Sequence, residues 1–103
     1  MNTVRILKDA LELLHTKGWC KYRETNLSGQ HCMIGAVHAV ELNHTKANEV
    51  IDFLAYSVDP EFEPKHEYGF EVVAPWNDLL TTEFNDVEYA FKDAIKRAKE
   101  LGL

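Results

Sequence analysis

The chain of 103 residues contains little proline, glycine or cysteine: three prolines, five glycines and two cysteines. Two cysteines, Cys20 and Cys32, are too few for the disulfide framework of a small secreted domain, so we expect free thiols. No apolar run approaches the roughly 20 residues that a membrane helix needs. Residues 1–5 lead into a charged amphipathic pattern rather than a secretory signal. We therefore expect one cytoplasmic domain, residues 1–103, without a membrane partner.

Basic side chains are scarce in the middle of the chain. Residues 41–88 contain 12 acidic and 2 basic side chains, whereas the net charge of the whole chain is −6. Nucleic-acid backbones are bound mainly by Lys and Arg, so direct nucleic-acid binding is not expected. The sequence also has no glycine-rich phosphate loop and no serine nucleophile elbow.

Apolar residues at helical spacing predict four helices. The first starts at Thr3, as its cap, and ends before Gly18. The second, residues 31–42, is apolar on nearly all sides and is therefore expected to be buried. Its internal Gly35 predicts a close helix crossing, because glycine there disfavours a helix by about 1 kcal/mol relative to alanine.

The remaining helices lie in the second half of the chain. Thr45 is expected to open the third, and Thr81 or Thr82 to cap the last, which has the clearest periodicity. Residues 19–23 alternate large apolar with polar side chains, and residues 70–73 form an apolar run before Pro75. Both are predicted to be strands that pair. The fold class predicted is therefore α+β, with about four helices and one short two-stranded β element.

Three motifs carry a resemblance to a known family. They are Gly-Trp after the first helix, Cys-x-x-Gly-Ala in the second and Trp-Asn-Asp before the last. The chain resembles a small domain family of unknown function found in actinobacteria and their phages, over nearly its whole length. That family implies no activity, cofactor or ligand. The residues that match are Gly18, Trp19, Cys32, Gly35, Ala36, Trp76, Asn77 and Asp78.

One alternative is a cysteine-dependent hydrolase or transferase. Cys32 lies at a predicted helix start, where the positive end of the helix lowers a thiol pKa. His66 and then Asn77 or Asp78 follow in the order of a Cys-His-Asn arrangement. Against this, the apolar neighbours of Cys32 predict a buried, inert thiol, because burial raises the pKa.

Metal binding is a weaker alternative. Cys20, His31, Cys32 and His38 could supply zinc ligands, but they lack the paired C-x2-C or H-x3-H spacing of a structural site. We expect neither a metal nor another cofactor.

Two sets of residues are predicted to bind. Trp76, Asn77 and Asp78 combine an indole with an amide and a carboxylate, which suits a small-molecule pocket or a structural corner. We expect Trp76 to be mostly buried, and Asn77 or Asp78 to bond to the turn before the last helix. Glu61, Glu63 and Glu67 lie in an acidic, proline-punctuated segment from Asp59 that we expect to be exposed.

The function predicted from these features is a small non-catalytic protein that contacts a protein partner through its acidic surface. The resemblance suggests an accessory protein of a phage or mobile element, which would work in the host cytoplasm. The partner and the oligomeric state are not specified by the sequence.

Overall fold

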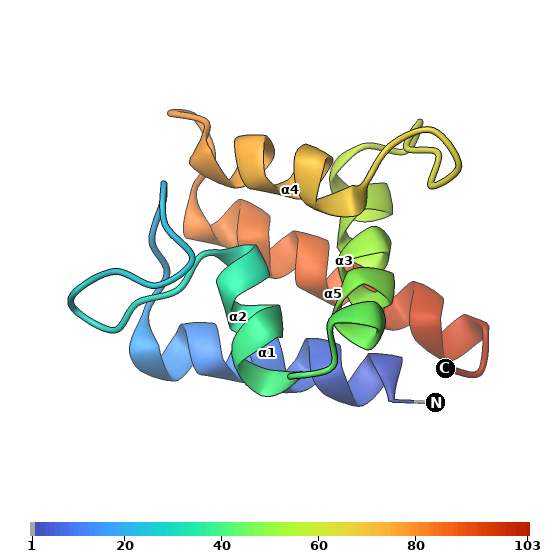
Figure 1. The fold of residues 1–103 in the computed structure, drawn as a ribbon, viewed down its shortest axis with the longest axis horizontal. Helices are drawn as coiled ribbons and strands as arrows, with labels where there is room; N and C mark the ends of the chain where they lie inside the picture. Colours follow the sequence, from blue (N-terminus) through green and yellow to red (C-terminus); the bar gives the residue numbers. More distant parts are fainter. Residues whose placement is uncertain (1) are drawn as a thin grey trace.

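The computed structural model describes residues 2–103 and contains five helices, joined by turns and loops. Figure 1 shows α1 and α5 running side by side in opposite directions, so that the start of α1 and the end of α5 lie at the same end of the molecule. The central helix is α3, which packs against all four others. The bounds are α1 Thr3–Lys17, α2 Met33–Val40, α3 His44–Val58, α4 Gly69–Asp78 and α5 Phe84–Glu100.

The α+β prediction is wrong, because residues 2–103 contain no strand or sheet. Residues 70–73 belong to α4, whose buried residues Gly69, Val73 and Asn77 recur every four positions. Pro75 is tolerated inside this helix because it lies on the exposed face, where water can satisfy the carbonyl left without a backbone donor. A short apolar run before a proline fits a strand and a buried helix equally well.

Residues 19–23 are not a strand either. Two isolated bridges join Trp19 and Thr25 to His31, so the segment folds back on its own loop. The backbone N–H of Cys20 donates to His31 O at 2.9 Å, and that of His31 donates to Gly18 O at 3.0 Å. This loop, residues 18–32, is called the motif loop below.

Gly35 marks a close approach, although to the motif loop rather than to another helix. A Cβ added to Gly35 would lie 2.7 Å from the carbonyl carbon of Glu24 and closer still to its oxygen. Only glycine lets the backbone of α2 come this near. The start of α2 is therefore held directly against the loop that precedes it.

The helix starts differ from the predicted caps. α3 is capped by Asn43, whose Oδ1 accepts from the N–H of Lys46 at 2.9 Å. α5 begins after Glu83, whose N–H donates to Asp86 Oδ2 at 2.8 Å. Thr82 instead donates its hydroxyl proton to Trp76 O at 2.7 Å, and so ties the end of α4 to the loop before α5.

The core is formed by apolar side chains from all five helices, together with Cys32 at the end of the motif loop and Phe62 of the loop between α3 and α4. No helix within residues 2–103 has the length and apolar composition needed to cross a bilayer.

Candidate functional site

The three sequence motifs meet at the side chain of Asn77, in the last turn of α4. Its Oδ1 accepts from Trp19 Nε1 at 2.7 Å and from the N–H of Met33, the first residue of α2, at 3.1 Å. Its Nδ2 donates to Cys20 O at 3.1 Å and to Asp78 Oδ1 at 3.0 Å. All the hydrogen-bonding positions of this amide are filled, and the residue is 1% exposed.

Asp78 extends this junction toward the surface. Its Oδ1 also accepts from the backbone N–H of Tyr22 at 2.8 Å. Tyr22 has a φ of 73°, in the left-handed region that large side chains rarely adopt, and its ring is exposed. The carboxylate of Asp78 therefore helps to hold a strained tyrosine at the tip of the motif loop.

The bonds of Asn77 and Asp78 go to different partners from those expected. We predicted contacts with the turn that leads into the last helix, and the structure places them on the motif loop and α2 instead. Trp76 is mostly buried, as expected, but not fully: it packs at the edge of the core and keeps part of its surface exposed. Because every hydrogen-bonding position of Asn77 is occupied within the protein, only Trp76 and Asp78 of the predicted pocket remain for a small molecule to contact.

Cys32 is the N-cap of α2 and is buried. Its Sγ accepts from the N–H of Gly35 at 3.3 Å. Burial raises the pKa of the Cys32 thiol above its ordinary value, and the N–H groups of Gly35 and Ile34 offset this only in part. Burial also raises the pKa of Cys20. Cys32 does line a hollow of about 160 Å³ beside Tyr22 and Asp78.

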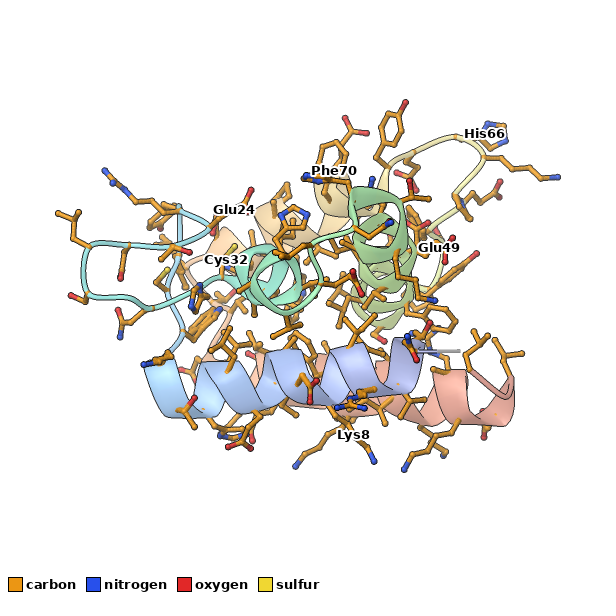
Figure 2. The ribbon with its side chains drawn as sticks, turned by 60° about the horizontal axis from the view of Figure 1, so that its bottom comes forward. Lys8, Glu24, Cys32, Glu49, His66 and Phe70 are labelled. Carbon is orange, nitrogen blue, oxygen red and sulfur yellow. The ribbon has the colours of Figure 1, made fainter. Side chains whose placement is uncertain are left out.

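The structure does not bring His66 to Cys32. His66 Nε2 lies 3.5 Å from Glu63 Oε2 in an exposed loop, and Figure 2 shows it at the other end of the molecule from Cys32. The two histidines nearest in sequence are engaged elsewhere: His31 Nδ1 lies 2.9 Å from Thr25 Oγ1, and His38 Nδ1 lies 2.9 Å from Glu24 Oε1.

The residues considered as zinc ligands are not arranged around one point. Across residues 2–103 the structure forms no group of three or more His, Cys, Asp or Glu side chains able to hold a metal ion. Cys20 Sγ instead donates weakly to the carbonyls of Arg23 and Gln30, each at 3.5 Å.

The acidic loop, residues 59–68, is largely exposed but is anchored to the core by one side chain. Glu61 and Glu63 are exposed and Glu67 is half-buried. Between the two exposed carboxylates Phe62 turns inward, is 2% exposed and packs edge-to-face on Tyr56 with ring centroids 5.1 Å apart. This anchor was missed from the sequence, although a single apolar residue between prolines and carboxylates was the available signal.

An exposed aromatic pair adjoins the acidic loop. The rings of Tyr68 and Phe70 stack with centroids 5.4 Å apart and planes 18° apart, and they are 69% and 45% exposed. Figure 2 shows Phe70 at the same upper edge of the molecule as His66. The carboxylate of Glu71 accepts from the N–H of Tyr68 at 3.2 Å and so fixes the start of α4 beneath the pair. Residues 64–68 and Glu71 also line a hollow of about 260 Å³.

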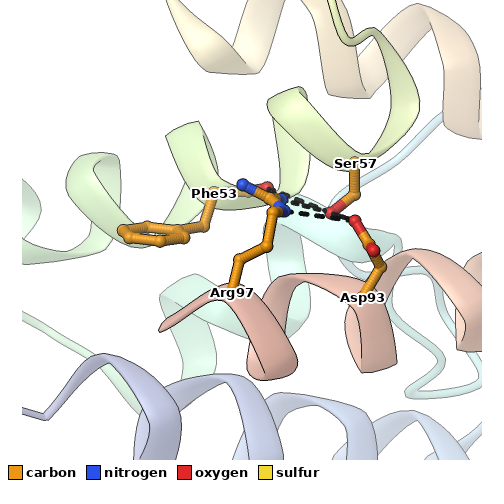
Figure 3. Close-up of polar contacts among 4 residues, drawn as sticks. All are labelled: Phe53, Ser57, Asp93 and Arg97. Atoms are coloured by element: carbon orange, nitrogen blue, oxygen red, sulfur yellow. Dashed lines mark hydrogen bonds and ion pairs between the residues drawn. The ribbon is translucent and has the colours of Figure 1, made fainter. Parts of the chain in front are cut away.

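A polar cluster between α3 and α5 was also missed. Arg97 donates to Asp93, Ser57 and the carbonyl of Phe53, as Figure 3 shows. The spacing of Asp93 and Arg97, four residues apart on one helix, was a readable signal for their pairing.

Comparison with known proteins assigns the chain to a family. Residues 1–97 match a family described as a family of unknown function, DUF6197. The chain therefore belongs to that family, which confirms the resemblance to a family of unknown function. No curated protein and no solved structure gives a significant match.

Proposed function

We propose that this protein is a non-catalytic binding protein that acts by protein–protein contact through its acidic surface. The surface comprises Glu61, Glu63 and Glu67 of the acidic loop together with the Tyr68–Phe70 pair. Its partner would carry a basic segment with an apolar anchor. The resemblance favours an accessory role for a phage or mobile element in the host cytoplasm.

The observation that carries the proposal is the exposed, stacked Tyr68–Phe70 pair beside exposed carboxylates. Aromatic side chains are enriched at the energetic centres of protein interfaces, where they supply apolar area with few rotatable bonds. A rim of like charge speeds association with an oppositely charged partner more than it raises affinity. The combination suits a basic partner better than a neutral one.

The loop is also partly ordered before any partner arrives. Phe62 anchors it in the core, and Asp59 Oδ1 accepts from the N–H of Glu61 at 3.0 Å. A preordered loop loses less conformational entropy on binding, so more of the contact energy is available as affinity.

Catalysis through Cys32 is disfavoured, since its thiol pKa is raised and no histidine of residues 2–103 bonds to its sulfur.

Capture of partners from a host lysate tests the proposal, using wild-type protein and Glu61→Gln/Glu63→Gln/Glu67→Gln. We expect the triple variant to bind the captured partner more slowly and with weaker dependence on salt, because exposed charges are screened within about 8–10 Å near physiological salt. Asp9→Asn/Glu12→Gln/Glu100→Gln is the matched control, since it removes the same charge from exposed positions elsewhere.

Tyr68→Ala/Phe70→Ala should weaken the same complex by increasing its dissociation rate. If both triple variants behave alike, and the aromatic variant keeps the wild-type dissociation rate, the acidic surface is not the binding site.

A further inference from the structure

A second surface feature is the groove between the end of α3 and the middle of α5. It has a volume of about 420 Å³, within the size range of protein binding pockets. Its lining combines two tyrosines and a proline with a hydroxyl and an ion pair. The lining residues are Tyr56, Ser57, Pro60, Tyr89, Asp93 and Arg97.

The guanidinium of Arg97 is held in one orientation at this groove. Its Nε donates to Asp93 Oδ2 at 3.2 Å, and its Nη2 donates to Phe53 O and Ser57 Oγ, each at 2.5 Å. The Ser57 hydroxyl in turn donates to Asp93 Oδ2, with Oγ and Oδ2 2.9 Å apart (Figure 3). The guanidinium carbon also lies 5.6 Å from the ring centroid of Tyr56. A long, flexible side chain is thereby ordered before any ligand binds.

This arrangement leaves one donor and one acceptor unused. Arg97 Nη1 and Asp93 Oδ1 have no hydrogen-bond partner among residues 2–103. Every buried side-chain nitrogen or oxygen in that part of the chain has a partner, so both atoms are open to solvent. Their charges offset each other, and the groove therefore has no excess positive charge to attract an anion.

The walls of the groove are aromatic and accessible. Tyr56 is 37% exposed, Tyr89 is 70% exposed, and Pro60 is also exposed. Aromatic-lined grooves bind proline-rich segments in the polyproline II conformation, whose prolines pack on the rings. The carbonyls of such a segment have no internal partner, so tyrosine hydroxyls and a fixed guanidinium can donate to them.

We infer that this groove binds a proline-rich, basic segment of a partner protein in the polyproline II conformation. The prolines pack on Tyr56 and Tyr89, and backbone carbonyls accept from Arg97 Nη1. Pro60 belongs both to the groove and to the acidic loop, so a Lys or Arg next to the prolines reaches Asp59 and Glu61. The inference rests on the proposed function and names the chemistry of its partner.

Fluorescence anisotropy with a labelled ten-residue peptide tests the inference. The peptide contains proline at every second or third position and two terminal arginines, and the control peptide has alanine at each proline. We expect the proline peptide to bind at least about tenfold more tightly, a difference of about 1.4 kcal/mol. Tyr89→Ala should raise its Kd about tenfold or more, as truncation of an interface hot spot does. Tyr22→Ala, at a similarly exposed tyrosine outside the groove, should not change it.

Equal binding of the two peptides, or an unchanged Kd for Tyr89→Ala, would overturn the inference. So would displacement of the peptide by millimolar benzoate, which would assign the groove to small aromatic carboxylates. The proposed function fails separately: it is overturned if Glu61→Gln/Glu63→Gln/Glu67→Gln captures partners like its matched control and Tyr68→Ala/Phe70→Ala keeps the wild-type dissociation rate, whether or not the peptide binds. Circular dichroism of each variant confirms that the helices are intact.

Discussion

Trp19 Nε1 donates a 2.7 Å hydrogen bond to Asn77 Oδ1, across 58 positions of the sequence. The same oxygen accepts the N–H of Met33, so one amide joins the loop after α1, the start of α2 and the end of α4. Asp78 adds a second bond between the motif loop and the end of α4 by accepting from the N–H of Tyr22.

Asn77→Ala should strongly destabilise the fold. It leaves Trp19 Nε1, the Met33 N–H and the Cys20 carbonyl without this partner, and each unsatisfied buried group costs about 1–3 kcal/mol. We expect the free energy of unfolding in urea to fall by roughly 3–5 kcal/mol, much of the total for a small domain. Asn85→Ala, at an exposed asparagine, is the control. Equal urea midpoints would show that water replaces the amide without loss.

Gly35→Ala should destabilise the protein, although alanine is usually more stable than glycine inside a helix. Alanine normally stabilises a helix interior by about 1 kcal/mol over glycine. Here the new Cβ would lie 2.7 Å from the backbone carbonyl carbon of Glu24, which cannot rotate away as a side chain can. We expect a loss of about 1–3 kcal/mol, the range for overpacking. Ala39→Gly, at an exposed position of the same helix, gives the ordinary preference for comparison. A more stable Gly35→Ala protein would contradict this contact.

Phe62→Ala should cost more stability than Trp76→Ala, although tryptophan is the larger residue. Phe62 is 2% exposed and packs on Tyr56, whereas Trp76 keeps part of its surface exposed at the edge of the core. Removing a fully buried aromatic costs about 3–5 kcal/mol, and removing a partly exposed one costs less. Thermal melts of the two variants show which substitution lowers the melting temperature more. The reverse order would mean that the acidic loop is not anchored through Phe62.

Asp52→Asn should raise the melting temperature slightly at pH 7 and leave it unchanged at pH 3. Burial raises the pKa of Asp52 above its ordinary value, and nearby Glu49 adds to this, while the Gly69 backbone offsets part of it. A carboxyl with a raised folded-state pKa stabilises the fold fully below its unfolded pKa, about 3.9, and loses that contribution as pH rises. Asparagine has no charge to bury. Equal melting temperatures of Asp52→Asn and the wild-type protein at both pH values would contradict the burial effect.

Cys32 should react slowly with iodoacetamide in the native protein and rapidly in denaturant. Its thiol is buried and its pKa is raised, so little thiolate forms at neutral pH. The native rate should rise only above the pH of about 8.5 at which an ordinary thiol ionises. The same raised pKa means that stability falls as pH increases through this range. Mass spectrometry of alkylated peptides follows each cysteine separately, and rapid native labelling of Cys32 at pH 7 would favour the cysteine-dependent alternative.

Several features could be predicted from residues alone. The periodic stripes of residues 3–17 and of the last helix located α1 and α5, because each is long enough for its spacing to be unambiguous. The lone Gly18 ended the first helix as expected, with a φ of 99°. The three motifs placed the chain in its family, although they carried no information on their own contacts.

The errors came from short segments. Residues 70–73 are too few to distinguish a strand from a helical turn, and only their packing on α2 and α3 decides for a helix. Likewise, the Asp93–Arg97 pair was visible on one helix, but its partners Phe53 and Ser57 come from another.

The sequence by itself determined the charge distribution, the long amphipathic helices and the family, because these depend on composition and on spacing within about 15 residues. The tertiary structure decided that residues 70–73 are helical, that Asn77 joins three segments, and that two tyrosines and Arg97 share a groove. Those outcomes depend on which apolar faces pack together and on which buried polar groups find partners across the fold. A chain satisfies its buried donors and acceptors over long separations, and no local pattern specifies the partners.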